Sequence, residues 1–385
     1  MSQPIERLLY VSPTSVFDQS NGASISIRTL LKGLGEKGIT VRALNATAFD
    51  HPDGAKLLNS MIQQPLKDER GFLVKHGDNY VTTLRTAHPD RRRMTTREEH
   101  FFFATFCRAL EDLKPDAILT WGAGVLDLLI MAEARRRAIP VIFYLVSNNY
   151  NDPFWKRDVS HFITDSEATA KYYKTSQGID VVSVGKFFDR EDFVTTDRDP
   201  IYITFVNPQE NKGAPLFAQL ALMAKDQLPS ARFLVVESRG KWPAALSAMD
   251  LDPKMFTNVD MAPIQDSMRA VYGVTRTLLV PSYKMDSGPR VIGEALINGI
   301  PVLGSNHGGV PENIGRGGRT FDIPEEYRES RRGLPPQSIV QPWLDEIRRH
   351  YSDNAYYAQL SEEARAESQK FDLDKSLQRF LGIFQ

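Results

Sequence analysis

The chain of 385 residues contains a single cysteine, Cys107, so it cannot form an internal disulfide bond. It also has no long apolar run, and the apolar stretch without a charged residue at 138–151 is too short to cross a bilayer. Charged residues occur in the first positions, where a signal peptide would be apolar. We therefore expect a cytoplasmic protein without a transmembrane helix.

Neither sign of charge is in excess, since 47 Lys and Arg residues stand against 48 Asp and Glu residues. Nucleic-acid binders usually carry a basic excess, so we expect no nucleic-acid partner. The seven histidines include no pair at the spacing of a helical metal site, and we expect no resident metal and no cofactor. Arginine triplets at 91–93 and 135–137 leave a peripheral contact with the inner face of a membrane open, although solvated helix ends are the favoured explanation.

Short apolar segments alternate with helical patterns along both halves of the chain, which predicts two parallel sheets covered by helices on both faces. The alternation stops over residues 186–200, where no apolar period remains. We predict an α/β protein with two Rossmann-like, doubly wound domains facing a cleft, at 1–193 and 194–370, and a C-terminal helix at 371–385 that packs back on the first domain. The expected strands are 8–12, 40–44, 117–120, 141–146, 202–206, 232–236, 277–280 and 301–304, with a hairpin at 72–84.

Two helices are predicted in more detail. The first lies between Gly22 and Gly38 and carries apolar residues at relative positions 0, 3, 4 and 7, which form one face of a helix. The second begins after Thr95 and Thr96, which form overlapping capping boxes with Glu98 and Glu99. A third helix is expected near residues 265–271. The expected core positions of the first two are Ile27, Leu30, Leu31 and Leu34, and Phe103, Phe106, Leu110 and Leu113.

Unusual residues gather in the loops that follow the strands of the second half, where ligands of parallel sheets bind. Lys212 stands before a helix start and can meet a phosphate together with the helix amides. Small residues precede another helix, so that its amides can approach a diphosphate, and Asp286 and Glu294 can flank one ligand there. Ordinary surface contacts of a lysine and two carboxylates are the alternative explanation.

Two other enzyme classes fit the sequence poorly. The Gly-x-Ser-x-Gly motif of serine hydrolases is missing. Gly122 and Gly124 follow a strand as in a dinucleotide fingerprint, but Asp127 replaces the third glycine, which argues against a dehydrogenase.

One long segment resembles the donor-site signature of the family 4 retaining glycosyltransferases, which have the GT-B fold. Its pieces are Pro281-Ser282, Asp286-Ser287-Gly288, Glu294-Ala295, Gly299-Ile300-Pro301-Val302 and Gly308-Gly309-Val310-Pro311-Glu312. Further pieces at 21–23, 164–167 and 210–213 extend the resemblance over nearly the whole chain.

The resemblance implies that Glu294 holds the nucleotide ribose, Asp286 holds the donor sugar and Lys212 neutralises the diphosphate. The chain departs from the family pattern at Asp286, where glutamate is usual, at Asn207, where arginine is usual, and at 147–150, where many relatives have a histidine. The implied donor-binding residues further include Asn207, Glu237, Ser287, Gly288, Pro289, Arg290, Val291, Gly22 and Ala23, and the acceptor-side residues are Ser147, Asn148 and Asn149.

By this resemblance the protein moves a sugar from UDP or GDP to an acceptor hydroxyl, with retention and without a metal. The implied acceptor is a sugar, a lipid-linked molecule or another hydroxyl compound, and the setting is bacterial glycan, polysaccharide or glycoconjugate synthesis. A sugar-nucleotide epimerase on the same fold, and a catalytically impaired subunit that only binds the sugar nucleotide, stay open as alternatives.

Overall fold

The computed structural model describes residues 4–63, 70–152, 154–329 and 333–384. It divides the chain into two compact units, one formed by Met1–Phe188 with Leu373–Gln385 and the other by Asp189–Asp372. The dividing points in the chain are thus 188/189 and 372/373, where the sequence analysis placed them at 193/194 and 370/371.

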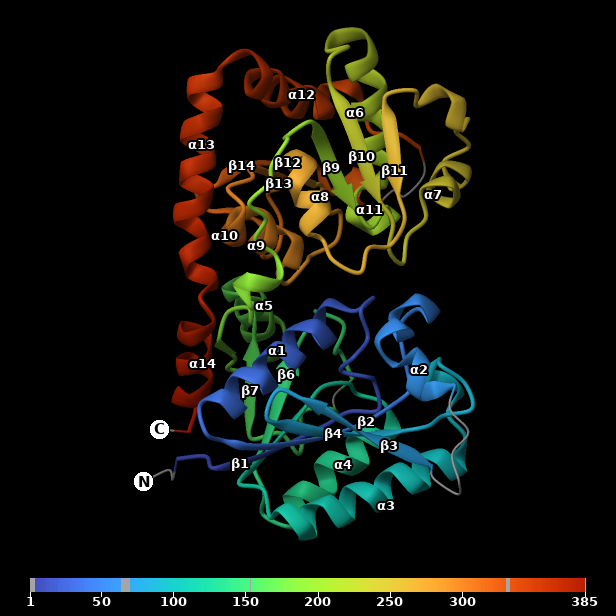
Figure 1. The fold of residues 1–385 in the computed structure, drawn as a ribbon, viewed down its shortest axis with the longest axis vertical. Coiled ribbons are helices and arrows are strands. Elements are labelled where there is room, and N and C mark those ends of the chain that lie inside the picture. Colours follow the sequence, from blue (N-terminus) through green and yellow to red (C-terminus); the bar gives the residue numbers. More distant parts are fainter. Residues whose placement is uncertain (1–3, 64–69, 153, 330–332, 385) are drawn as a thin grey trace. The chain divides into compact units, whose positions relative to one another are not determined.

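The first unit contains an eight-stranded sheet in the order β3-β4-β2-β1-β5-β6-β7-β8 (Figure 1). Its neighbouring strands pair in parallel, except that β3 and β4 form the antiparallel hairpin predicted at 72–84. The strands are β1 (Arg7–Val11), β2 (Thr40–Ala46), β3 (Gly71–His76), β4 (Asn79–Leu84), β5 (Ala117–Thr120), β6 (Val141–Leu145), β7 (His161–Thr164) and β8 (Val182–Ser183).

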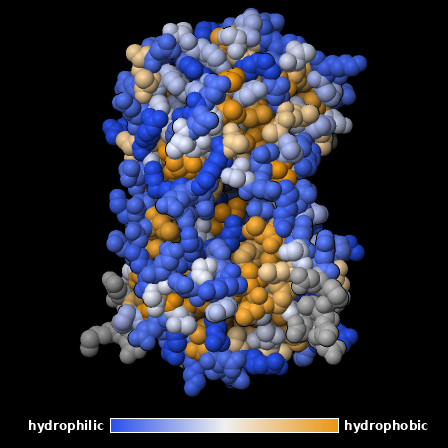
Figure 2. Space-filling model, viewed as in Figure 1, coloured by the Kyte–Doolittle hydropathy of each residue, from blue (hydrophilic) through white to orange (hydrophobic). Residues whose placement is uncertain are grey.

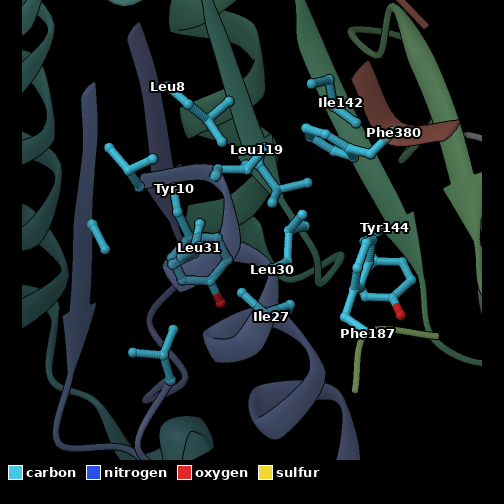
Figure 3. Close-up of a cluster of buried hydrophobic side chains, with 14 of the residues drawn as sticks. Leu8, Tyr10, Ile27, Leu30, Leu31, Leu119, Ile142, Tyr144, Phe187 and Phe380 are labelled. Atoms are coloured by element: carbon cyan, nitrogen blue, oxygen red, sulfur yellow. The ribbon is translucent and has the colours of Figure 1, made fainter. Parts of the chain in front are cut away.

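Alternate residues of each strand point to opposite sides of this sheet, and apolar residues occur on both sides. Helices therefore cover both faces. In β1, Leu8 and Tyr10 join a cluster with α1 and α14, whereas Leu9 and Val11 join one with α3 and α4. Figure 3 shows the first cluster, and Figure 1 shows α14 in red beside α1 in blue. The helices of this unit are α1 (Gly22–Glu36), α2 (Asn59–Ile62), α3 (Thr96–Leu113), α4 (Val125–Arg136), α5 (Glu167–Gln177) and α14 (Leu373–Gly382).

The predicted apolar face of α1 is confirmed, since Ile27, Leu30, Leu31 and Leu34 are all buried. In α3 the prediction of Phe103 as a core residue is wrong. Phe102 is fully buried and Phe103 only partly, because Phe102 is four residues from Phe106 and shares its face of the helix.

The second unit contains a six-stranded sheet in which every neighbouring pair is parallel, in the order β11-β10-β9-β12-β13-β14. The sequence analysis overlooked the short, partly polar strands β11 and β14, and the helix expected at 265–271 begins later, at Arg269. The strands are β9 (Tyr202–Val206), β10 (Arg232–Val236), β11 (Val259–Ala262), β12 (Thr275–Val280), β13 (Val302–Ser305) and β14 (Gly318–Phe321). The helices are α6 (Ala214–Gln227), α7 (Trp242–Ala248), α8 (Arg269–Val274), α9 (Arg290–Ile297), α10 (Val310–Ile314), α11 (Glu325–Glu329), α12 (Gln337–Ser352) and α13 (Asn354–Glu367).

The surface mixes hydrophilic residues with apolar patches on the face drawn in Figure 2. Exposed large apolar side chains occur in both units, among them Val125, Phe154 and Met261. Such residues are common on soluble proteins and do not by themselves mark a functional surface.

Candidate functional site

The loop after β9 and the loop after β12 lock together in the second unit. The amides of Tyr283 and Lys284 both donate to the Asn211 carbonyl, at 3.0 and 3.3 Å. Gly213 has φ +92°, and a Cβ there would lie 1.9 Å from the Pro281 carbonyl oxygen. Only glycine fits this approach, which holds Lys212 against the loop that carries Asp286.

Lys212 and Asp286 form an ion pair between Nζ and Oδ2. Their side chains are 28% and 18% exposed, so that both charges are accessible from solvent. The strands that precede their loops, β9 and β12, are neighbours in the sheet, and the carboxyl ends of these strands meet at one edge. This pair can present an ammonium and a carboxylate to one polar ligand.

The glycine pair after β13 packs against the same loop. The Gly309 amide donates to the Asp286 carbonyl at 2.7 Å, and a Cβ on Gly309 would lie 1.9 Å from the Ser287 carbonyl oxygen. The structure therefore brings three parts of the predicted signature together, namely residues 281–288, the start of α9 and residues 308–312.

Helix α9 begins directly after this loop, at Arg290, with Pro289 as its N-cap residue. Proline has no side-chain acceptor, so no side chain caps the first amides of α9. The positive end of the helix dipole lies at the same place, next to Ser287 and Gly288. Backbone groups in such a position favour an anion.

Glu294 is buried within α9, with 5% exposure, and neighbouring side chains hold its carboxylate. The Tyr272 hydroxyl donates to Oε2 at 2.6 Å, and Arg290 Nε lies 3.3 Å from Oε1. The Arg290 guanidinium also lies over the Phe193 ring, 5.6 Å from its centroid. Burial first, and then the charge of Glu294, raise the pKa of Tyr272 well above its ordinary value, so the hydroxyl stays a donor at neutral pH.

Asn207 and Glu237 stabilise the loops that follow β9 and β10. Asn207 has φ +64°, and its Oδ1 accepts from the Gly240 amide at 2.8 Å. Glu237 Oε1 accepts from the Trp242 amide at 3.0 Å, at the start of α7. Asn207 therefore joins the loop after β9 to the loop after β10, whereas Glu237 binds a backbone group at the end of its own loop.

The remaining predicted residues belong to the first unit. Gly22 is exposed at the first turn of α1, and the Ala23 amide donates to the Asn21 cap at 2.8 Å. Ser147 follows β6, where its carbonyl accepts from the Tyr173 hydroxyl at 2.7 Å, and Asn148 and Asn149 continue that loop.

The arginine triplets are engaged by neighbouring side chains. Arg91 pairs with buried Asp127, which also accepts from the Gly124 amide at 2.8 Å. Asp127, which replaces the third glycine of the dinucleotide fingerprint, therefore holds the loop at 122–124 in place. In the second triplet, Arg136 and Arg137 both pair with Glu133, at 2.7 Å.

Sequence reasoning missed Tyr272 and a buried ion pair between Lys186 and Asp165. Neither carried a local signal, because each depends on packing between distant segments. Within the described ranges, no helix is long and apolar enough to span a membrane. The same ranges hold no group of three or more His, Cys, Asp or Glu residues arranged for a metal ion.

No known family model matches this chain, and no curated protein sequence matches it significantly. Several solved structures, by contrast, are similar to it in fold. A glycosyltransferase from Rickettsia africae ESF-5 superimposes with a TM-score of 0.67 at 13% identity, covering 98% of this chain and 97% of that one. Alr3699/HepE from Anabaena, in complex with UDP-glucose, gives 0.67 at 16% identity, covering 98% of both chains.

A UDP-GlcNAc 2-epimerase from Neisseria meningitidis, bound to UDP-GlcNAc, is also similar, with a TM-score of 0.55 at 14% identity over 98% of both chains. At such identities the likeness concerns the fold. The predicted fold class, two Rossmann-like units with parallel sheets as in GT-B glycosyltransferase structures, is confirmed.

Proposed function

We propose that this protein is a retaining glycosyltransferase that moves a sugar from a nucleoside diphosphate, UDP or GDP, to an acceptor hydroxyl. The observation that carries the proposal is the convergence of Lys212, Asp286 and the start of α9 at one edge of the second sheet. Similar folds in solved structures that hold UDP-glucose support it.

In this proposal Glu294 binds the ribose hydroxyls of the donor. A carboxylate oxygen accepts more than one hydrogen bond, so both oxygens keep acceptor capacity beside Tyr272 and Arg290. Asp286 binds hydroxyls of the donor sugar, and Lys212 faces the diphosphate. Ser287, Gly288 and the first amides of α9 share the negative charge of the leaving group.

Charge is the main difficulty of the reaction, because the diphosphate leaves while positive charge develops on the sugar. Preorganised amides and Lys212 stabilise that transition state without reorganising. We infer that a donor phosphate oxygen accepts the acceptor's proton, so the acceptor attacks the face that the diphosphate leaves and the configuration is retained. The proposal requires no metal.

We assign donor binding to the second unit and acceptor binding to the first, through Ser147, Asn148 and Asn149. The proposed setting is cytoplasmic synthesis of a bacterial glycan, polysaccharide or glycoconjugate.

Thermal melting with UDP, GDP, ADP and CMP tests the donor assignment. A ligand at a hundred times its Kd stabilises a protein by about 2.7 kcal/mol, which is a measurable shift in Tm. We expect one diphosphate to raise the Tm with or without EDTA, and Glu294→Gln to reduce that shift. Glu362→Ala, on the exposed side of α13, is the control. If no nucleotide changes the Tm, the assignment is wrong.

A sugar-nucleotide epimerase is the second candidate, favoured by the similarity to the Neisseria enzyme. An epimerase of this kind needs no acceptor. We expect UDP or GDP release to depend on an added acceptor, and NMR of the product to show a retained anomeric configuration. Release or inversion at C2 without any acceptor would favour the epimerase.

A further inference from the structure

A hollow of about 200 Å³ opens in the first unit, and none of its described lining residues is among those assigned to donor or acceptor above. It lies beyond the carboxyl ends of β2 and β4, beside the first turns of α3. Four strand intervals separate β4 from β6, whose following loop carries Ser147. At about 4.8 Å per interval, the hollow lies about 19 Å along the sheet from that loop.

Three arginines line the hollow: Arg70, Arg85 and Arg97. Arg70 lies over the Phe101 ring, 4.8 Å from its centroid, and Arg85 donates to the Met61 carbonyl. Neither Arg70 nor Arg97 forms an ion pair with an acidic side chain in the described part of the chain. Among the described residues, therefore, no carboxylate neutralises either guanidinium group.

Glu98, the one carboxylate among the described lining residues, is engaged elsewhere. Its Oε2 accepts from the Thr95 amide and hydroxyl, at 2.7 and 2.8 Å, and its Oε1 accepts from the Ala87 amide at 2.5 Å. Among the lining residues that the structure describes, arginines outnumber carboxylates by three to one.

The rest of the lining is apolar. Leu84 and Phe102 are buried and belong to the core between the sheet and α3, and the half-buried Phe101 and Met94 pack against that core. The floor of the hollow is thus part of a packed interior, which fixes its shape. Arginine forks around such a floor suit a phosphate attached to an apolar body, because guanidinium groups bind phosphate oxygens in pairs and the apolar part leaves water.

We propose that this hollow binds an amphiphilic phosphate, a phosphoryl group carried on an alkyl, prenyl or aromatic body. This inference rests on the proposed transferase function: the hollow anchors the acceptor, whose phosphate lies between Arg70 and Arg97. The class of acceptor is then a phosphorylated amphiphile, either lipid-linked or a free small molecule.

Calorimetric titration with octyl phosphate tests this site without needing a donor or turnover. We expect octyl phosphate to bind, inorganic phosphate and octyl glucoside to bind at least tenfold more weakly, and Arg97→Gln to weaken octyl phosphate by about tenfold, as loss of a charged hydrogen bond does. Arg108→Gln is the matched control, since Arg108 is exposed on the same helix but does not line the hollow. Arg97 is itself exposed, so its variant should fold.

Three results would overturn the proposal: unchanged binding in both Arg97→Gln and Arg70→Gln, equal binding of octyl glucoside, and equal binding of inorganic phosphate. Lys212→Met separates this site from the donor site, because it should reduce UDP binding and leave octyl phosphate binding intact. Octyl phosphate binding without any nucleotide binding would keep this site and reject the proposed function. Long-chain prenyl phosphate presented in vesicles, compared with octyl phosphate, then distinguishes a lipid-linked acceptor from a free one.

Discussion

Tyr272 and Glu294 are joined by a hydrogen bond of 2.6 Å, although 22 residues separate them in the chain. Tyr272 belongs to α8 and Glu294 to α9, and both are buried. The tyrosine hydroxyl fixes the orientation of a carboxylate that we assign to the donor ribose. Tyr272 thereby acts as a positioning residue.

Tyr272→Phe should weaken UDP binding without changing the fold. Hydrogen bonds to charged groups contribute about 1.5–3 kcal/mol, so we expect a drop in unfolding free energy of that order and a loss of UDP affinity of about tenfold. Urea denaturation and calorimetric titration measure the two effects. Tyr351→Phe is the control, because its hydroxyl donates to the Ile201 carbonyl at 3.1 Å. Equal UDP affinities in both variants would remove the positioning role.

Lys212 and Asp286 should have opposite effects on nucleotide binding. Lys212→Met removes a positive charge from the diphosphate site and should weaken UDP. Asp286→Asn removes the negative partner and should leave UDP binding equal or tighter, while slowing sugar transfer by about a hundredfold through lost contacts to the sugar. Titration with UDP and initial rates at saturating donor separate these effects, with Lys225→Met as a control on α6. Parallel losses of UDP affinity in both variants would contradict the roles assigned here.

Gly213 should be far less tolerant of substitution than Gly178, although both have positive φ. At Gly178 nothing lies within 4 Å of an added Cβ, so Gly178→Ala carries only the backbone strain of about 1–2 kcal/mol. At Gly213 the added Cβ meets the Pro281 carbonyl, and we expect a loss of more than about 3 kcal/mol. Urea denaturation compares the variants. Similar losses would mean that the two loops do not need their close contact.

The parallel sheets were predictable because their strands are short, apolar segments that alternate with amphipathic helices. The loops that carry Lys212 and Asp286 lie close together because β9 and β12 are neighbours, but the ion pair between the two residues was not predicted. By contrast, the sequence could not place Tyr272 against Glu294, because that contact depends on how residues of α8 and α9 meet in the folded chain. Strands β11 and β14, at the two edges of the second sheet, were overlooked because each has only four residues of mixed polarity.

The hollow in the first unit was not predictable for a related reason. It needs β3 and β4 to bring Arg70 and Arg85 beside residues of α3, which no periodicity in the sequence specifies. For Asn207, the sequence showed the unusual residue but not the reason for it. Its departure from the family's arginine was visible, but its structural reason, a positive φ with a hydrogen bond to the Gly240 amide, was not.

Glu98 makes the stability of the first unit depend on pH in a direction that can be tested. Burial raises its pKa, but hydrogen bonds from Thr95 and from the Ala87 amide lower it by more, so the pKa in the folded chain is below the ordinary value. The ionised carboxylate therefore stabilises the fold above the unfolded pKa of about 4.3, and this contribution is lost as the pH falls through the lower folded pKa.

Glu98→Gln should accordingly be less stable than the parent at pH 7, by an amount that shrinks as the pH falls below about 4. Urea denaturation of both proteins between pH 7 and pH 3 measures the difference. Glu99→Gln removes a charge from the same helical turn without breaking the capping box, so it controls for the helix dipole. A difference between parent and Glu98→Gln that stays constant over this range would show that Glu98 ionisation does not contribute to folding.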